Sequence, residues 1–245
     1  MVISIVNQKG GCGKTTSTMC LAYSLHQAGK KVLVIDLDAQ ANLTEAVGLD
    51  LEEVSLGMNV AKSMLEEQSF KIYPMEWSDV VPSSIDLSMV PNKFMGRIDG
   101  FYLLRNLIDE VRDNYDYILI DCPPSLEFLV SNALNASDGV IIPLQSKPLG
   151  IYGLNAIESY IASIQKSANK NLKILGLITT MTDNTVISRE VSEELKNNYE
   201  VLGEIPRTVS VVEMTATNDP KGFFDGKSKA AEAYNQIAKK VMAYG

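Results

Sequence analysis

A glycine-rich segment near the amino terminus has the residue types and spacing of a phosphate-binding loop. It begins at Asn7 and reads NQKGGCGKTT. Its three glycines let backbone N–H groups turn toward an anion with no Cβ in the way. Lys14 is placed to reach the outer phosphates of a nucleotide, and the Thr15 hydroxyl is a suitable ligand for Mg²⁺. The segment therefore predicts a site for a nucleotide and its metal.

The segment departs from the standard phosphate-loop pattern G-x-x-x-x-G-K-[ST]. Gln8 stands where that pattern has its first glycine, and Lys9 adds a second lysine before the glycines. A Gly-rich turn with no ligand is the alternative, but GKTT directly after an apolar run is a specific match to a phosphate loop. The loop residues expected to contact nucleotide are Lys9, Gly10, Gly11, Cys12, Gly13, Lys14, Thr15 and Thr16.

The elements around this loop are those of a layered α/β fold. Short apolar runs predict buried strands at residues 2–6, 32–35, 117–120, 140–142 and 174–178. Helical patterns are expected at residues 15–28, 60–67, 99–114, 126–135, 152–167, 186–198 and 228–243. Strands that alternate with helices predict a doubly wound, mostly parallel sheet with helices on both faces. We expect one such domain over residues 1–245, with 50–98 as an elaborated connection inside it.

Two carboxylates follow predicted strands. Asp38 lies just past the strand at 32–35, and Asp121 ends the strand at 117–120. Parallel sheets place their sites at the carboxyl ends of strands, so both are expected near the loop. Asp121 suits Mg²⁺ held through water, and Asp38 is a further candidate for the metal. Asp36 is expected either near the metal and loop lysine or in a purely structural role.

Several segments together resemble the ParA/MinD class of partition and positioning ATPases. KGGCGKTT matches the deviant phosphate loop of that class, and VLVIDLDAQAN, YDYILIDCPPS, NALNASDGVIIP and GEIPR are similar to its later motifs. The resemblance covers nearly the whole chain and is strongest to the Soj/ParA branch. It implies a P-loop NTPase fold with ATP and Mg²⁺ as cofactors. Ala39 departs from the proline that is usual in the family.

The resemblance also implies roles for individual residues. Lys9 is the signature lysine, which reaches across an ATP-dependent homodimer to the partner's nucleotide, and a cation there would neutralise charge on the transferred phosphoryl group. Asp38 orients the attacking water, so the catalytic set is Lys9, Lys14 and Asp38. On the base side, Met181, Pro206 and Arg207 occupy positions like those of the family's adenine contacts.

Partition ATPases of this branch bind nonspecific DNA as ATP dimers and are stimulated by a centromere-binding, ParB-like adaptor protein. Arg207 matches the first basic position of the family's IPRxxR segment, but Ser210 stands at the second. Lys221, Lys227 and Lys229 are candidates for a replacement basic patch, with a scattered solvated face as the alternative.

Composition sets further expectations. The net charge is −8, which by itself argues against nucleic acid, yet residues 1–150 carry 11 basic and 19 acidic side chains, whereas residues 151–245 carry 11 of each. No apolar run approaches membrane-spanning length, and no amphipathic membrane anchor is expected at the carboxyl terminus. The three cysteines and one histidine form no metal-ligand spacing. We expect a cytoplasmic protein that is nucleoid-associated when ATP is bound, with no membrane partner.

Three other functions remain open from the sequence. The first is a positioning ATPase whose cargo is a protein assembly. The second is a nucleotide-binding regulator with negligible hydrolysis, and the third is a metabolic kinase. The main expectation is an ATP-hydrolysing switch that partitions a plasmid or chromosome.

Overall fold

An eight-stranded sheet forms the centre of the protein in a computed structural model, which describes residues 1–245 apart from the side chains of Leu149, Ile151, Tyr152 and Thr215. The strand order is β3-β4-β2-β5-β1-β6-β7-β8, and only the β3–β4 pair is antiparallel. The strands are β1 (Val2–Ile5), β2 (Val32–Asp36), β3 (Tyr73–Pro74), β4 (Asp79–Val81), β5 (Tyr117–Asp121), β6 (Gly139–Gln145), β7 (Lys173–Thr182) and β8 (Val201–Pro206). The expected doubly wound, mostly parallel sheet is confirmed.

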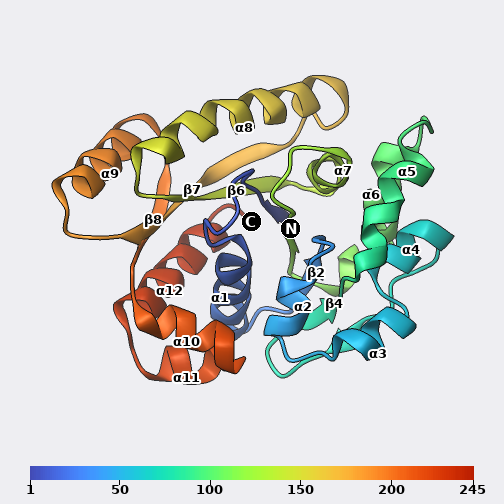
Figure 1. The fold of residues 1–245 in the computed structure, drawn as a ribbon, viewed down its shortest axis with the longest axis horizontal. Coiled ribbons are helices and arrows are strands. Elements are labelled where there is room, and N and C mark those ends of the chain that lie inside the picture. The colour runs from blue at the N-terminus through green and yellow to red at the C-terminus, as the bar shows by residue number, and fades with distance from the viewer.

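Helices cover both faces of this sheet (Figure 1). One face packs against α4 (Val60–Glu66), α5 (Val90–Phe94), α6 (Leu103–Asp109), α7 (Phe128–Ala136), α8 (Pro148–Ser167) and α9 (Val186–Asn198). The other packs against α1 (Lys14–Gln27), α2 (Asn42–Ala46), α10 (Val209–Thr217), α11 (Pro220–Asp225) and α12 (Lys229–Met242). The remaining helical segments are α3 (Leu51–Leu56) and three 3₁₀ turns, η1 (Ile85–Met89), η2 (Gly100–Tyr102) and η3 (Arg112–Asn114).

The inner strands bury both faces, which explains their uninterrupted apolar sequence. In β2, Leu33 and Ile35 join the core under α4 to α9, while Val32 and Val34 join the core under α1 and α12. Alternate residues of a strand point to opposite faces, so a strand covered on both sides needs apolar residues at every position. The five strands expected from apolar runs are all present, with ends shifted by up to four residues.

The single helix expected over residues 99–114 is wrong. The structure has η2, α6 and η3 there instead. The side-chain amide of Asn132 donates to the Gly100 carbonyl at 3.1 Å, and that of Asn135 donates to the Phe101 carbonyl at 2.8 Å. Two side chains from α7 thus bind these carbonyls, and the Leu104 N–H donates to Asn132 Oδ1. The regular helix therefore begins only at Leu103.

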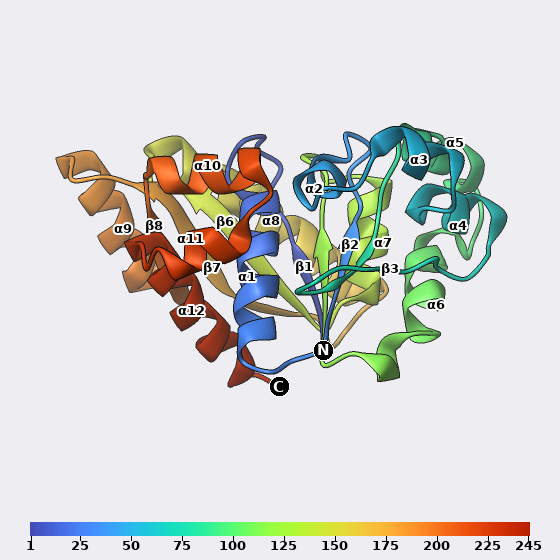
Figure 2. The same cartoon turned by 90° about the horizontal axis from the view of Figure 1, so that it is seen from below.

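The carboxyl ends of the parallel strands all meet one edge of the sheet. In Figure 2 the two chain ends lie at the opposite, lower edge, whereas α2 and α10 lie at the upper one. Residues 50–98 fold as α3, α4, β3, β4, η1 and α5, and β4 pairs with β2 in the same sheet. This segment is therefore part of the sheet fold. Within the described part of the chain, no helix has the length and apolarity needed to cross a membrane.

Candidate nucleotide site

The predicted phosphate loop connects β1 to α1 at the carboxyl edge of the sheet. Gly11 and Gly13 have φ values of +69° and +92°, which a residue with a Cβ adopts only at a cost. A Cβ on Gly13 would also lie 3.4 Å from the Thr180 methyl group. Gly10 has open space around it and no positive φ. The loop thus requires glycine at two of its three glycine positions on conformational grounds.

Side chains from β6 and β7 hold this loop in place. The Thr180 hydroxyl donates to the Cys12 carbonyl at 2.8 Å, and the Gln145 amide donates to the Gly11 carbonyl at 2.9 Å. Gln145 and Thr180 are paired neighbours across the two strands. Thr180 was expected on the base side beside Met181, whereas Gln145 was not predicted from the sequence. Each is a polar residue at the end of an apolar strand, which was the available signal.

The two loop lysines have different surroundings. Lys14 is buried, and its ammonium donates to the Lys9 carbonyl at 3.2 Å. Lys9 is half-buried, and its ammonium donates to Gln145 Oε1 at 3.1 Å. The Lys14 ammonium therefore lies inside the curve of the loop, whereas the Lys9 ammonium lies outside it, against the end of β6.

Asp121 lies directly beneath the loop at the end of β5. The Thr15 hydroxyl donates to Asp121 Oδ2 at 2.7 Å, and the Thr18 hydroxyl donates to Oδ1 at 3.4 Å. The carboxyl group is buried, and burial followed by repulsion from Asp36 raises the pKa of Asp121 to about 8. A cation beside Thr15 would offset this cost of burying a carboxylate. The structure thus brings together the two residues expected to serve Mg²⁺.

Asp36 has a structural role, the second of the two roles expected for it. Its carboxylate is fully buried and accepts from the Thr44 N–H at 2.9 Å, the Thr44 hydroxyl at 2.7 Å and the Asp38 N–H at 3.1 Å. Burial raises the pKa of Asp36 to about 6, against these hydrogen bonds. Asp36 therefore fixes the backbone that carries Asp38.

Asp38 lines a cavity of about 370 Å³ together with the phosphate loop. The other lining residues are Gly10, Gly11, Gly13, Lys14, Thr15, Thr16, Asn42, Pro124 and Met181. Asp38 is half-buried, and its Oδ1 accepts from the Gln40 N–H at 3.0 Å. A carboxylate therefore faces the space where phosphates would sit, from the strand end next to β5.

A second cavity of about 180 Å³ adjoins the first and is mainly apolar. Gly13, Thr16 and Met181 line both cavities, and Pro206, Arg207 and Val211 line the second. Met181 has a φ of +54°, an uncommon conformation for a residue with a long side chain. The three residues expected on the base side thus lie around a pocket that continues from the phosphate loop.

The oxygen donors fit a hydrated Mg²⁺ better than a metal held by protein alone. Magnesium is commonly bound through one or two protein oxygens, with water and substrate phosphates completing its shell. Thr15 and Asp121 supply a hydroxyl and a carboxylate at hydrogen-bond distance. Across the described residues, no group of three or more His, Cys, Asp and Glu side chains forms a metal cluster. The donor set therefore suits a metal that arrives with a nucleotide.

The candidate DNA-binding residues lie on separate elements. Arg207 is exposed at the end of β8, Lys221 is in α11, and Lys227 and Lys229 flank the start of α12. All three lysines are exposed. In the sequence, Asp225 lies between Lys221 and Lys227, and Asp219 and Glu232 flank the three lysines. This stretch of the sequence is therefore not strongly basic.

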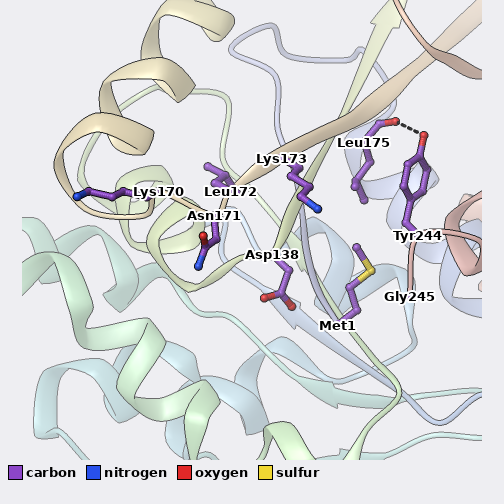
Figure 3. A pocket seen from close by; sticks show the side chains of 9 residues that line it. All are labelled: Met1, Asp138, Lys170, Asn171, Leu172, Lys173, Leu175, Tyr244 and Gly245. Carbon is purple, nitrogen blue, oxygen red and sulfur yellow. Dashed lines mark hydrogen bonds between the residues drawn. The ribbon is translucent and has the colours of Figure 1, made fainter.

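A further cavity, of about 530 Å³, lies at the opposite edge of the sheet (Figure 3). It is lined by both chain ends and by Asp138, Lys170 and Lys173, and the Tyr244 hydroxyl closes one side by donating to the Leu175 carbonyl at 3.1 Å. No glycine-rich loop or helix amino terminus with free N–H groups faces it among its described lining residues. The smaller cavities at the carboxyl edge have the chemistry for a nucleotide.

Comparison with known proteins places the chain in one group. Residues 1–174 match the family model described as an AAA domain. The sporulation initiation inhibitor protein Soj of Bacillus subtilis is 36% identical, and the alignment covers 100% of this chain and 99% of that protein. The chromosome partitioning protein ParA of Myxococcus xanthus is 33% identical, with 98% of this chain and 87% of that protein covered.

Solved structures agree on the fold. Cobyrinic acid a,c-diamide synthase from Mycobacterium smegmatis, with bound ADP and magnesium, has a TM-score of 0.86 at 30% identity and covers 99% of this chain and 94% of its own. A plasmid partition protein from Borrelia burgdorferi, bound to AMPPNP, has a TM-score of 0.85 at 25% identity and covers 100% and 99%. With its loop, its paired strand-end aspartates and these relatives, the chain belongs to the Soj/ParA family of P-loop ATPases.

Proposed function

We propose that the chain is an ATP-hydrolysing molecular switch for plasmid or chromosome partition. In this proposal it binds ATP and Mg²⁺, dimerises in that state, binds DNA nonspecifically, and is released by hydrolysis that a ParB-like adaptor stimulates. The observation that carries the proposal is the single cavity shared by the phosphate loop, Thr15 and Asp38. Relatives named as the chromosome partitioning protein ParA and as a chromosome-partitioning ATPase support the partition role.

ATP and Mg²⁺ are the ligands that this cavity fits best. The loop offers backbone N–H groups and Lys14 to phosphates, and the amino terminus of the 14-residue helix α1 points at the same space. Two similar structures hold ADP with magnesium and AMPPNP, respectively. When bound, Mg²⁺ would neutralise phosphate charge beside Thr15 and Asp121.

Asp38 is the residue we assign to the attacking water. Its carboxylate faces the phosphate cavity, and its N–H is held by the buried Asp36. A carboxylate in this place can accept a hydrogen bond from water and aim its lone pair at the outer phosphate. Lys14 and the loop N–H groups would stabilise the charge on the phosphate oxygens. Hydrolysis would then depend on Asp38, whereas binding would depend on the loop.

Lys9 is the residue we assign to the partner's nucleotide in an ATP-dependent homodimer. Lys14 already occupies the position within the loop, and Lys9 lies outside it. A second cation that reaches an adjacent nucleotide would make each site complete only in the dimer. Dimerisation would also place two copies of the surface around Arg207, Lys221, Lys227 and Lys229 on one particle, which strengthens a weak nonspecific DNA contact.

The test measures phosphate release and molecular mass on the same variants. Wild-type protein with MgATP should release phosphate slowly, and Asp38→Ala should reduce the rate by about 100-fold or more. The Asp38→Ala protein should be dimeric with MgATP and monomeric with MgADP in light scattering. Adding Lys9→Ala should return it to a monomer.

An exposed aspartate provides the matched control. Asp113 lies in η3, and Asp113→Ala should leave both phosphate release and the dimer unchanged. Equal phosphate release from wild type and Asp38→Ala would contradict the enzymatic assignment. A monomeric Asp38→Ala protein in MgATP would contradict the role of Lys9 across the interface.

The likeness to a diamide synthase does not favour amide synthesis here. Release of ammonia from glutamine commonly needs a reactive cysteine activated by a neighbouring base. All three cysteines, Cys12, Cys20 and Cys122, are buried. The one histidine, His26, is exposed in the last turn of α1. This chain therefore lacks an accessible thiol–imidazole pair for that chemistry.

A further inference from the structure

The ammonium of Lys9 contacts its own chain. It donates to Gln145 Oε1 at 3.1 Å, across 136 residues of sequence. The Lys9 backbone is fixed at both ends of the residue, because its N–H donates to Asn7 Oδ1 at 2.9 Å and its carbonyl accepts from Lys14 at 3.2 Å. From this fixed backbone the side chain folds back over the end of β6. A lysine proposed to act on a partner's nucleotide is thus held in cis.

The Gln145 side chain is itself oriented by two other contacts. Its Nε2 donates to the Gly11 carbonyl at 2.9 Å and lies 3.5 Å from the Met181 sulfur. Because both contacts use the nitrogen, Oε1 is the atom left to face Lys9. The first turn of α8 presses on the same residue, since a Cβ on Gly150 would lie 2.6 Å from the Gln145 carbonyl oxygen. The acceptor for Lys9 is therefore preorganised.

We propose that Gln145 is a positioning residue that holds Lys9 on its own chain and must release it when the ATP dimer forms. This inference rests on the proposed function. The Lys9 side chain lies against the end of β6 of its own chain to reach Gln145. In the proposed dimer, the partner's phosphates would lie across the interface. The cis contact and the trans contact therefore compete for one ammonium, and Gln145 sets how readily the dimer assembles.

Two substitutions at Gln145 should change dimerisation in opposite directions. Gln145→Ala removes the acceptor and frees Lys9, whereas Gln145→Glu offers it a carboxylate and holds it more strongly. At a half-exposed site, where solvent weakens the contribution of the charge, a hydrogen bond of ordinary net strength shifts an equilibrium by about fivefold. Each dimer breaks two such contacts, so Gln145→Ala should lower the dimer dissociation constant by about 25-fold and Gln145→Glu should raise it similarly.

The experiment uses the full chain carrying Asp38→Ala, so that the dimer accumulates in MgATP. Sedimentation equilibrium gives the dimer dissociation constant for this parent, for Gln145→Ala, for Gln145→Glu, and for a control, Gln236→Ala, at an exposed position of α12. The control should match the parent. Thermal unfolding without nucleotide shows whether each variant is folded.

The sign of the two effects separates the possible outcomes. Both variants lose the N–H donated to the Gly11 carbonyl, so a role confined to clamping the loop would shift both in the same direction. That result, or an unchanged dissociation constant in both, would overturn the inference and leave the proposed function standing. A parent that forms no dimer in MgATP would overturn both.

Discussion

Thr44 joins three backbone segments at the carboxyl edge of the sheet through a single hydroxyl group. It is fully buried, donates to the Asp36 carboxylate at 2.7 Å, and accepts from the Ser83 N–H at 2.9 Å. Asp36 in turn accepts from the Asp38 N–H. A chain of hydrogen bonds therefore runs from the end of β4 to the residue that we assign to the attacking water.

Removing the Thr44 hydroxyl should loosen Asp38 without changing the nucleotide pocket. Thr44→Val keeps the shape of the side chain but leaves the buried Ser83 N–H without its acceptor, which costs about 1–3 kcal/mol of unfolding free energy. Phosphate release should fall because Asp38 loses support, while the dissociation constant for MgATP changes little. Chemical denaturation and single-turnover phosphate release measure the two effects.

Thr44→Ser is the matched control, because it keeps the hydroxyl and removes only a methyl group. It should retain phosphate release close to the wild-type rate. Equal loss of phosphate release in Thr44→Val and Thr44→Ser would contradict a specific role for the hydroxyl group, because Thr44→Ser keeps it.

The residues predicted from the sequence and the residues that were missed differ in the range of their contacts. The phosphate loop, Asp38 and Asp121 follow from local order, because each comes directly after an apolar strand. Gln145 and Thr44, which were missed, act on partners 134 and 8 residues away, respectively. Which loop carbonyl faces which side chain depends on strand register and loop conformation, which composition and periodicity do not specify.

At the scale of elements, apolar runs predict the inner strands of the sheet but not the strands at or next to its edges. Inner strands such as β5 are buried at every position and read as apolar runs. The edge strand β8 is half-buried and contains Gly203, Glu204 and Pro206. At the other side of the sheet, the edge strand β3 has two residues and its neighbour β4 has three. The search for apolar runs missed β8 because its run is interrupted, and it missed β3 and β4 because they are too short to form one. The helix expected at residues 228–243 was confirmed as α12, and its apolar residues Ala231, Tyr234, Ile237, Ala238 and Val241, which recur at helical spacing, are buried.

The contact between α12 and β8 depends on a glycine. A Cβ on Gly203 would lie 2.6 Å from Ile237 Cγ1, so the helix approaches the strand where no side chain intervenes. Gly203→Ala should reduce the unfolding free energy by about 1–3 kcal/mol through overpacking. In an Ile237→Ala background the same change should cost nothing further, because the cavity accepts the added methyl group.

Urea denaturation of the four proteins in this double-mutant cycle measures the coupling. Gly96→Ala is the control, since Gly96 has open space around it and no positive φ. It should leave the unfolding free energy nearly unchanged. Additive effects of Gly203→Ala and Ile237→Ala would show that the two residues do not limit each other's packing.

At the scale of the whole molecule, the uneven charge sets what kind of DNA contact the protein can make. The net charge of −8 arises entirely in residues 1–150, whereas residues 151–245 are balanced and contain every candidate DNA contact. Even there, Asp225 lies between Lys221 and Lys227 in the sequence, and Asp219 and Glu232 flank the three lysines Lys221, Lys227 and Lys229. One copy of such a surface would hold DNA weakly, so binding should require the ATP dimer and fall steeply with salt.

Two triple substitutions test whether this surface, rather than overall charge, binds DNA. The first changes Lys221, Lys227 and Lys229 to Gln, and the second changes Lys166, Lys170 and Lys173, which are exposed at the end of α8 and the start of β7. Both remove three positive charges. In the Asp38→Ala background with MgATP, the first should weaken binding to a DNA duplex and flatten the salt dependence by about 0.9 in log–log slope per lost phosphate contact. The second should leave the slope unchanged, because a charge that does not touch phosphate releases no counterion. Equal loss from both variants would mean that net charge governs the interaction and that the lysines around α11 form no DNA-binding surface.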